Sequence, residues 1–394
     1  MKDLKEILLI GFYPMAQIQP FVNEMQSQYK IIIRYLQEFT ALGTAGGLFH
    51  FRDQIRCGNP DAFFVLNGDV CADFPLAELY QFHKEQPTKC NNTARVTIIA
   101  TEATRQQSLN YGCIVVNKET MEVTHYVEKP SSYVSSLINC GIYVFSLEIF
   151  QTLEEMFNRK QQKIYSNMNG NGPTVNGNSP PGNDRDVGYI QLEQEILQPL
   201  SGSGRVFAMP VTSWWSQLKT AGAAIYANRH YLQLYRRKHP ERLAKPSGGG
   251  GDGCTIIPDV HINSTASVHH TAVLGPNVSI GPGVVVGAGV RIKESIVLAN
   301  AIIEERSLVL HSIIGKNSRI GKWARVEGTA TDPDPNKPFA KMDNLPLFST
   351  EGKLNPSITI LGCSVSVSAE TVLLNSVVLP NKELSRSIKN EIIL

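Results

Sequence analysis

Aliphatic residues recur at every sixth position through much of the last third of this 394-residue chain. Repeats this short cannot each bury a core alone, so they must stack on one another, and the period indicates a solenoid. Branched aliphatic side chains at one phase are typical of short parallel strands that each point a side chain inward. The first row comprises Ile262, Val268, Leu274, Ile280, Val286, Ile292 and Leu298.

A second row follows four residues behind, and glycines follow the middle rungs, where tight corners favour residues that adopt positive φ. The pattern resembles the hexapeptide repeat of left-handed parallel β-helices, in which three hexads make one coil; a β-sandwich with chance spacing is the alternative. After a shift of phase the period continues, breaks and resumes, which predicts a β-helix over 255–394 with an inserted loop at 328–357. The later rows are Ile296, Ile302, Leu308, Ile314, Ile320 and Val326, then Leu361, Val367, Leu373 and Leu379.

The composition limits the kinds of partner that the protein binds and the cell compartment in which we expect it. With 37 basic and 35 acidic residues, the net charge of +2 gives no electrostatic support for binding nucleic acid or an anionic membrane. The longest apolar runs are strand-sized, and the first six residues lack the apolar stretch of a signal peptide. Seven scattered cysteines show no CxxC pair, which predicts reduced thiols and a cytoplasmic protein.

Residues 1–237 alternate strand-like and helix-like segments, which predicts an α/β domain with a mostly parallel sheet. In such sheets ligands bind at the carboxyl ends of the strands. The polar stretch 159–187 predicts a flexible surface insertion, and 238–254, with four consecutive glycines, predicts a linker. The expected strands are 6–11, 30–35, 62–67 and 94–100, and the expected helices are 18–29, 44–57 and 76–86.

Two glycine-containing motifs follow expected strands. Leu42-Gly43-Thr44-Ala45-Gly46 opens a helix, where backbone N–H groups suit a base or a phosphate, although such turns are common. Asn67-Gly68-Asp69 places a carboxylate just past an apolar strand. That position is typical of Mg²⁺ ligands in nucleotidyl transfer, and it is equally typical of a strand-terminating turn. Spacing alone leaves both interpretations open at both motifs.

Two further motifs come at short distance. Glu128 and Lys129, in the stretch YVEKP, offer a carboxylate for sugar hydroxyls and an ammonium for a phosphate. A solvated ion pair before a proline turn is the alternative. Asn139 lies in the stretch INCGIY ten residues later and adds a neutral amide to the same set.

The order of these motifs is more informative than any one of them. The chain carries its motifs in the order typical of the sugar-1-phosphate nucleotidyltransferases: LGTAGG, LNGDV, VEKP, NCGIY and then a hexapeptide ladder. Over nearly its full length the chain resembles mannose-1-phosphate guanylyltransferase (GDP-mannose pyrophosphorylase). Within that family it resembles the alpha-type, regulatory subunits, because of the insertion at 328–357 and the stretch Trp215-Ser216-Gln217. The resemblance implies a Rossmann-like nucleotidyltransferase domain ahead of the β-helix.

The resemblance also implies which residues contact ligands. It places Glu128, Lys129 and Asn139 at the sugar and its phosphate, and Asp69 at the metal, which is Mg²⁺ in the family. No catalytic residue follows from the motifs. The residues implied to contact the nucleotide are Leu42, Gly43, Thr44, Ala45, Gly46, Asn67 and Gly68.

The chain departs from the family's pattern in two places. Active members carry Trp-x-Asp late in the catalytic domain, and its Asp is the second metal ligand. Gln217 stands there in this chain and offers only a neutral oxygen, so we expect Mg²⁺ to bind weakly. The family's loop GGxGTRxxPL, which cradles the triphosphate, is absent before the strand at 6–11. We therefore expect an N-terminally truncated sheet with an unpaired central edge.

These departures favour a regulatory subunit of the complex that makes GDP-mannose from GTP and mannose-1-phosphate. Such a subunit would be weak or inactive by itself and would sense GDP-mannose or a related nucleotide sugar. Its expected partners are a catalytic beta-type subunit and further copies in a homo- or hetero-oligomer, with 328–357 reaching a neighbouring subunit. The alternatives are a catalytically active guanylyltransferase, a non-enzymatic assembly subunit, and an acyltransferase with His269, His270 and His311 as candidates.

Overall fold

The computed structural model describes residues 4–86, 95–168, 188–245, 253–330 and 346–394. Its contacts divide the chain into two compact units, one ending at Trp215 and the other beginning at Ser216. Each unit is described by itself below. Much of the expected insertion at 159–187, of the linker at 238–254 and of the loop at 328–357 lies outside the described residues. The sequence-based domain limits at 237 and 255 remain predictions.

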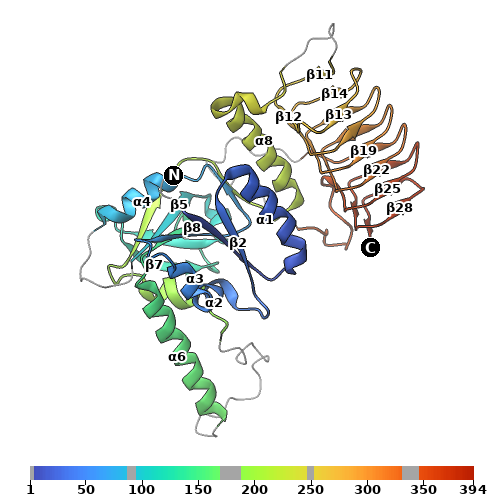
Figure 1. The fold of residues 1–394 in the computed structure, drawn as a ribbon. Coiled ribbons are helices and arrows are strands. Elements are labelled where there is room, and N and C mark those ends of the chain that lie inside the picture. Colours follow the sequence, from blue (N-terminus) through green and yellow to red (C-terminus); the bar gives the residue numbers. More distant parts are fainter. Residues whose placement is uncertain (1–3, 87–94, 169–187, 246–252, 331–345) are drawn as a thin grey trace. The chain divides into compact units, whose positions relative to one another are not determined.

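The first unit is built around a sheet in which β8 is the central strand (Figure 1). The strand order is β7-β6-β8-β5-β9, and β3 also pairs with β8. Seven of the nine residues of β8 are buried, because strands lie on both of its edges and its side chains form part of the core. The strands are β3 (Phe63–Leu66), β5 (Val96–Glu102), β6 (Gly112–Val116), β7 (Val123–Glu128), β8 (Leu137–Phe145) and β9 (Val206–Pro210).

This sheet is mixed, so the expectation of a mostly parallel sheet was wrong. β8 runs antiparallel to β3, β5 and β6, whereas β5 and β9 are parallel. β8 is not among the four strands expected from the sequence. It follows the hairpin of β6 and β7 in the chain and lies between β3 and β5 in the sheet. As a consequence, the start of β8 lies at the carboxyl ends of β3 and β5, where Leu66 pairs with Ile142 and Glu102 with Leu137.

β1 (Glu6–Gly11) and β2 (Ile32–Gln37) form a parallel pair of their own. Within the described residues β1 pairs only with β2 and β3 only with β8. Two further short strands are β4 (Val70–Ala72) and β10 (Trp215–Gln217), and β10 begins at the last residue of this unit.

The helices begin and end close to the expected positions, with two exceptions. The helix expected over 44–57 is divided at Phe51 into α2 and α3. Residues 159–168, expected to belong to a flexible insertion, continue the helix α6, because Lys, Arg and Gln are good helix formers. The helices are α1 (Met15–Tyr29), α2 (Gly43–His50), α3 (Arg52–Arg56), α4 (Leu76–Glu85), α5 (Arg105–Ser108), α6 (Ile149–Met168), the π-helix η1 (Leu192–Leu197) and α7 (Gln198–Leu200). No helix in the described part of the chain is long and apolar enough to cross a membrane. The six cysteines described are all free thiols.

The second unit is a stack of short parallel strands in three sheets, the arrangement of a left-handed parallel β-helix (Figure 1). The first sheet is β11 (Thr255–Ile256), β14 (Val273–Leu274), β17 (Arg291–Lys293), β20 (Leu308–Leu310), β23 (Arg325–Glu327), β26 (Val372–Leu374) and β29 (Ile388–Lys389). The second is β12 (Val260–Ile262), β15 (Val278–Ile280), β18 (Ser295–Val297), β21 (Ser312–Ile314), β24 (Thr359–Leu361), β27 (Val377–Val378) and β30 (Ile392–Ile393). The third is β13 (Ser267–Val268), β16 (Val285–Val286), β19 (Ile302–Ile303), β22 (Arg319–Ile320), β25 (Ser366–Val367) and β28 (Glu383–Leu384).

The coil length explains where the expected ladder shifts by one residue. Val260 pairs with Val278, 18 residues later, but Val278 pairs with Ser295, 17 residues later. The corner after β17 therefore holds one residue fewer, and a slip of one residue turns a side chain to the other face. The expected inward residues Ile296, Ile302, Leu308, Leu298 and Leu379 are not in the buried row. The buried residues at these rungs are Val297, Ile303, Val309 and Val378.

The corners of the coils carry non-glycine residues with positive φ, stacked in columns. One column contains Asn277 (φ 58°), Glu294 (φ 47°) and His311 (φ 45°). Asparagine adopts this conformation easily, whereas a longer side chain such as glutamate does so rarely and needs compensating contacts. The contacts of Glu294 therefore require an explanation.

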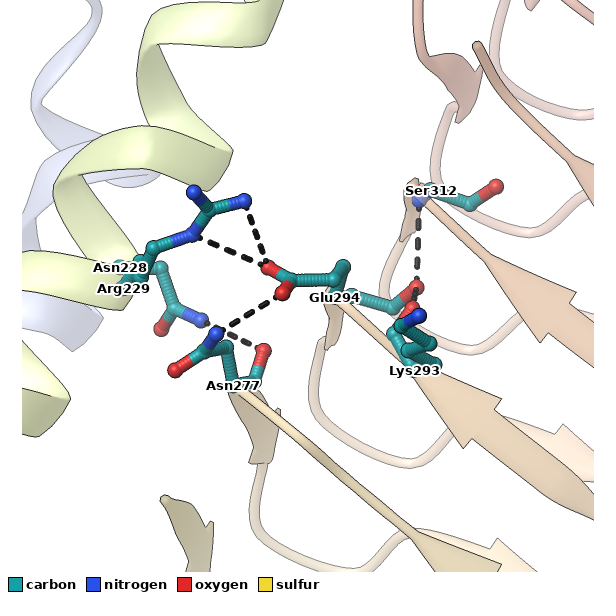
Figure 2. A network of polar contacts seen from close by, with 7 residues as sticks. Asn228, Arg229, Asn277, Lys293, Glu294 and Ser312 are labelled. Carbon is teal, nitrogen blue, oxygen red and sulfur yellow. Dashed lines mark hydrogen bonds and ion pairs between the residues drawn. The ribbon is translucent and has the colours of Figure 1, made fainter. Parts of the chain in front are cut away.

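Glu294 is the centre of a polar network that joins the β-helix to α8 (Ala221–Lys238), which packs on β15 and β18 (Figure 2). Arg229 donates to Glu294 Oε2 from Nε at 3.3 Å and from Nη2 at 3.2 Å, and Asn277 Nδ2 donates to Oε1 at 2.8 Å. Asn228 donates to the carbonyl of Asn277 and accepts from Ser279 Oγ at 2.6 Å. The buried carboxylate is thus paired and hydrogen-bonded, which offsets its desolvation. A 3₁₀ turn, η2 (Pro240–Arg242), follows α8.

Arg229→Ala is expected to lower the free energy of unfolding of the second unit by about 1 kcal/mol, because Glu294 keeps only its bond from Asn277. Lys322→Ala is the matched control. Lys322 and Glu305 pair on the surface with side chains more than half exposed, so the change should stay within about 0.5 kcal/mol. Denaturant unfolding of both variants measures the difference, and equal effects would contradict the structural role of the network.

Candidate functional site

Asn139 on β8 organises a cluster of polar side chains at the carboxyl ends of β3 and β5. Its Nδ2 donates to the hydroxyls of Tyr126 at 3.0 Å and Tyr143 at 2.8 Å, and its Oδ1 accepts from the N–H of Gly141 at 2.9 Å. Both side-chain donors of Asn139 are therefore used within the fold. Tyr126 in turn donates to Glu128 Oε2 at 2.9 Å. Burial raises the pKa of Tyr126, so its hydroxyl keeps the proton that it donates to Glu128.

The turn after β3 is joined to the same cluster through the backbone of β8. The N–H of Asn67 donates to the carbonyl of Gly141 at 2.9 Å. Gly141 has a φ of +70°, and a Cβ there would lie 2.6 Å from Asn67 Nδ2, so a glycine is required on both counts. Gly68 and Asp69 follow Asn67 in this turn. The structure thus brings the LNGD and NCGIY motifs together.

Glu128 and Lys129 differ in their surroundings. Glu128 ends β7 with 18% of its side chain exposed, whereas 63% of Lys129 is exposed, and the two charged groups lie 3.7 Å apart. The N–H of Lys129 donates to the carbonyl of Tyr111 at 3.1 Å, which holds the turn in place. The Lys129 side chain is therefore exposed on a backbone held in place, while Glu128 is already bound by Tyr126.

The LGTAG stretch forms the start of α2 and is bound along its length to residues 188–193. Ile190 donates its N–H to the carbonyl of Leu42 and accepts from the N–H of Ala45, both at 2.9 Å. Gly43 has a φ of +71°, and a Cβ there would lie 2.6 Å from the carbonyl oxygen of Ile190. A Cβ on Gly46 would collide with the carbonyl oxygen of Gly188. These glycines are needed for the approach of the 188–190 backbone, a reason that the sequence alone does not reveal.

Sequence reasoning missed Glu193 on the π-helix η1. Thr44 Oγ1 donates to Glu193 Oε2 at 2.8 Å and accepts from the N–H of Leu192 at 2.7 Å. The Thr44 side chain is therefore committed to η1. The sequence signal was weak, because a carboxylate in a stretch such as LEQEIL reads as an exposed helix position.

The expected metal site has few charged ligands. Asp69 is partly buried after β3, and Gln217 is the last residue of β10. Among the described residues no group of three or more His, Cys, Asp or Glu side chains could hold a metal ion. Mg²⁺ is normally bound through carboxylates together with substrate phosphates and waters. The weak binding of Mg²⁺ expected from Gln217 remains a prediction.

The comparisons with known proteins cover both units. The nucleotidyl transferase family model matches residues 3–171, and the model of the GMPPB C-terminal domain matches residues 256–394. The mannose-1-phosphate guanylyltransferase regulatory subunit alpha of Drosophila melanogaster is 63% identical over 400 residues, covering 100% of this chain and 89% of the relative. The chain belongs to this family of alpha-type regulatory subunits. Relatives of the same name in Xenopus tropicalis (53% identical, 100% of this chain and 89% of the relative) and Papio anubis (51%, 99% and 88%) agree.

Membership in the family of regulatory alpha subunits accounts for the combination seen in the structure. A nucleotidyl transferase unit is followed by a β-helix, and the motifs LNGD, VEKP and NCGIY converge on β8. Nucleotidyl transferases of this kind generally use Mg²⁺. The alternatives of an active enzyme, a pure assembly subunit or an acyltransferase are not favoured by these relatives.

Proposed function

We propose that this regulatory subunit senses GDP-mannose through the cluster around Asn139 and the LGTAG stretch. The observation that carries the proposal is the hydrogen-bonded set of Asn139, Tyr126 and Glu128, held at the strand ends where ligands bind in open sheets. Such preorganised polar groups recognise a nucleotide sugar without needing to catalyse its formation.

The same proposal extends to partners, cofactor and compartment. Because the relatives are named as regulatory subunits, we propose a catalytic beta-type guanylyltransferase subunit as partner, in a homo- or hetero-oligomer in the cytoplasm. Gln217 at the position of the family's second carboxylate argues that the chemistry resides in that partner, and that Mg²⁺ is not required for sensing.

The decisive experiment has two readings on the purified chain. Calorimetric titration with GDP-mannose is expected to give saturable binding, and the chain alone is expected to release pyrophosphate from GTP and mannose-1-phosphate no faster than the background. Turnover at ordinary enzymatic rates without a partner would overturn the regulatory proposal in favour of an active guanylyltransferase. Absence of binding would overturn the sensing proposal.

Lys129→Ala is expected to weaken GDP-mannose binding about tenfold, because one charge-assisted contact to a phosphate is lost. The side chain is largely exposed, so folding should be unaffected. Lys118→Ala removes another exposed lysine from the turn between β6 and β7 and should leave the affinity unchanged. Titrations of the two variants test the placement of the phosphate, and equal affinities would contradict it.

A further inference from the structure

Glu193 binds the LGTAG stretch from η1, an element that packs against both α2 and β7. Its carboxylate accepts the hydroxyl hydrogen of Thr44 in that stretch. Thr44 Oγ1 also accepts from the N–H of Leu192, so the hydroxyl makes two hydrogen bonds to η1. The LGTAG stretch is the nucleotide half of the candidate site, and this bond joins it to η1.

The element that carries Glu193 also packs against the sugar half, which comprises Asn139, Tyr126 and Glu128. η1 contacts β7, the strand that ends in Glu128, and Leu192 of η1 shares a buried core cluster with Tyr126 and Tyr143. Burial raises the pKa of Tyr143, and the negative charge of Glu193 adds to that effect. Tyr143 accepts from Asn139, the residue that also holds Tyr126 and, through it, Glu128. η1 therefore contacts both halves, and Glu193 is its side-chain link to Thr44.

The element that carries Glu193 is rigidly held. Lys160 of α6 pairs with Glu195 Oε1 at 2.7 Å, and the N–H of Gln191 donates to Glu195 Oε2 at 2.7 Å. Leu192, Ile196 and Leu197 are buried. A π-helical turn is rare and is frequently found at functional sites.

We propose that Glu193 is a positioning residue that sets the distance between the nucleotide loop and the sugar cluster, so that one nucleotide sugar contacts both at once. This inference rests on the proposed function. A ligand with two joined parts gains affinity from its second part only when the geometry permits simultaneous contact. Loss of Glu193 should therefore remove the advantage of the sugar and leave the nucleotide contact, because Ile190 still holds Leu42 and Ala45.

The test compares the affinities of GDP and GDP-mannose for the full chain by calorimetry. In Glu193→Ala the ratio of the two affinities is expected to fall about tenfold, with GDP binding changed less than about twofold. Glu193→Gln retains an oxygen that accepts from Thr44 and should keep most of the ratio. Gln194→Ala, an exposed neighbour on η1, is the matched control and should behave as the unchanged protein.

The outcomes separate the inference from the function on which it rests. If the unchanged protein binds neither ligand, the proposed function itself fails. If it binds GDP-mannose but Glu193→Ala weakens GDP and GDP-mannose by the same factor, the residue is merely structural and the inference is overturned. An unchanged ratio in Glu193→Ala overturns it as well, whereas a reduced ratio that Glu193→Gln restores supports it.

Discussion

Gly46→Ala is expected to destabilise the first unit by about 2–3 kcal/mol, although alanine normally favours a helix over glycine. The added Cβ would overlap the carbonyl oxygen of Gly188 and lie 3.3 Å from its carbon. Relief requires the 188–190 backbone to move, and that movement breaks the bonds of Ile190 to Leu42 and Ala45. The substitution should therefore also detach η1 from Thr44 and weaken GDP-mannose binding.

Gly68→Ala is the matched control, because no atom lies within 4 Å of the Cβ that it would add. It sits in the turn after β3, in the same unit, and should change the free energy of unfolding by less than about 0.5 kcal/mol. Denaturant unfolding of both variants gives the comparison. Similar midpoints for Gly46→Ala and the unchanged protein would show that the 188–190 backbone is free to retreat.

The stability of the first unit is expected to fall in acid because of His83. This side chain on α4 is 2% exposed, its Nδ1 lies 2.8 Å from Thr97 Oγ1, and its Nε2 has no partner among the described residues. Burial, with a contribution from the positive charge of Arg95, lowers the pKa of His83 from 6.5 to about 4. The unfolded chain therefore binds the proton more readily at every pH between those values.

The sign and size follow from that difference. Stability is fully present above pH 6.5 and is lost as the pH falls towards 4, with about 2 kcal/mol gone between pH 7 and pH 5. His83→Gln, which does not titrate, should remove this part of the pH dependence, whereas His125→Gln on the exposed side of β7 should not. Unfolding curves at pH 7 and pH 5 decide the matter. The same loss in His83→Gln and in the unchanged protein would assign the acid sensitivity to other groups.

The β-helix could be predicted from the sequence because its core depends on a period that every coil repeats. Its exact register could not. The corner at Glu294 is one residue shorter than the corner at 275–277, and a period of six carried through it selects Ile302 instead of Ile303. Corner length depends on how the backbone turns between two sheets, and the aliphatic residues on either side do not encode that.

The candidate site, too, could be predicted only in part. The resemblance implied that the motifs LNGD, VEKP and NCGIY contact one ligand, and the strand end before LNGD was the expected place for it. Their internal contacts were not foreseen. The side-chain amide of Asn139 donates to the hydroxyls of two tyrosines, and Thr44 binds Glu193, 149 residues later in the chain. Contacts of that separation depend on the strand order around β8, which was itself mistaken from the sequence. The roles assigned to the individual site residues remain predictions.

The network at Glu294 also bears on how such solenoids acquire new attachments. The carboxylate that receives Arg229 comes from a corner residue, while the rows that fill the core come from the neighbouring strands. A corner can therefore exchange its side chain, and with it the helix that it anchors, without repacking the interior. His311 occupies the equivalent corner one coil further on, which makes it a natural place to graft a second docking residue.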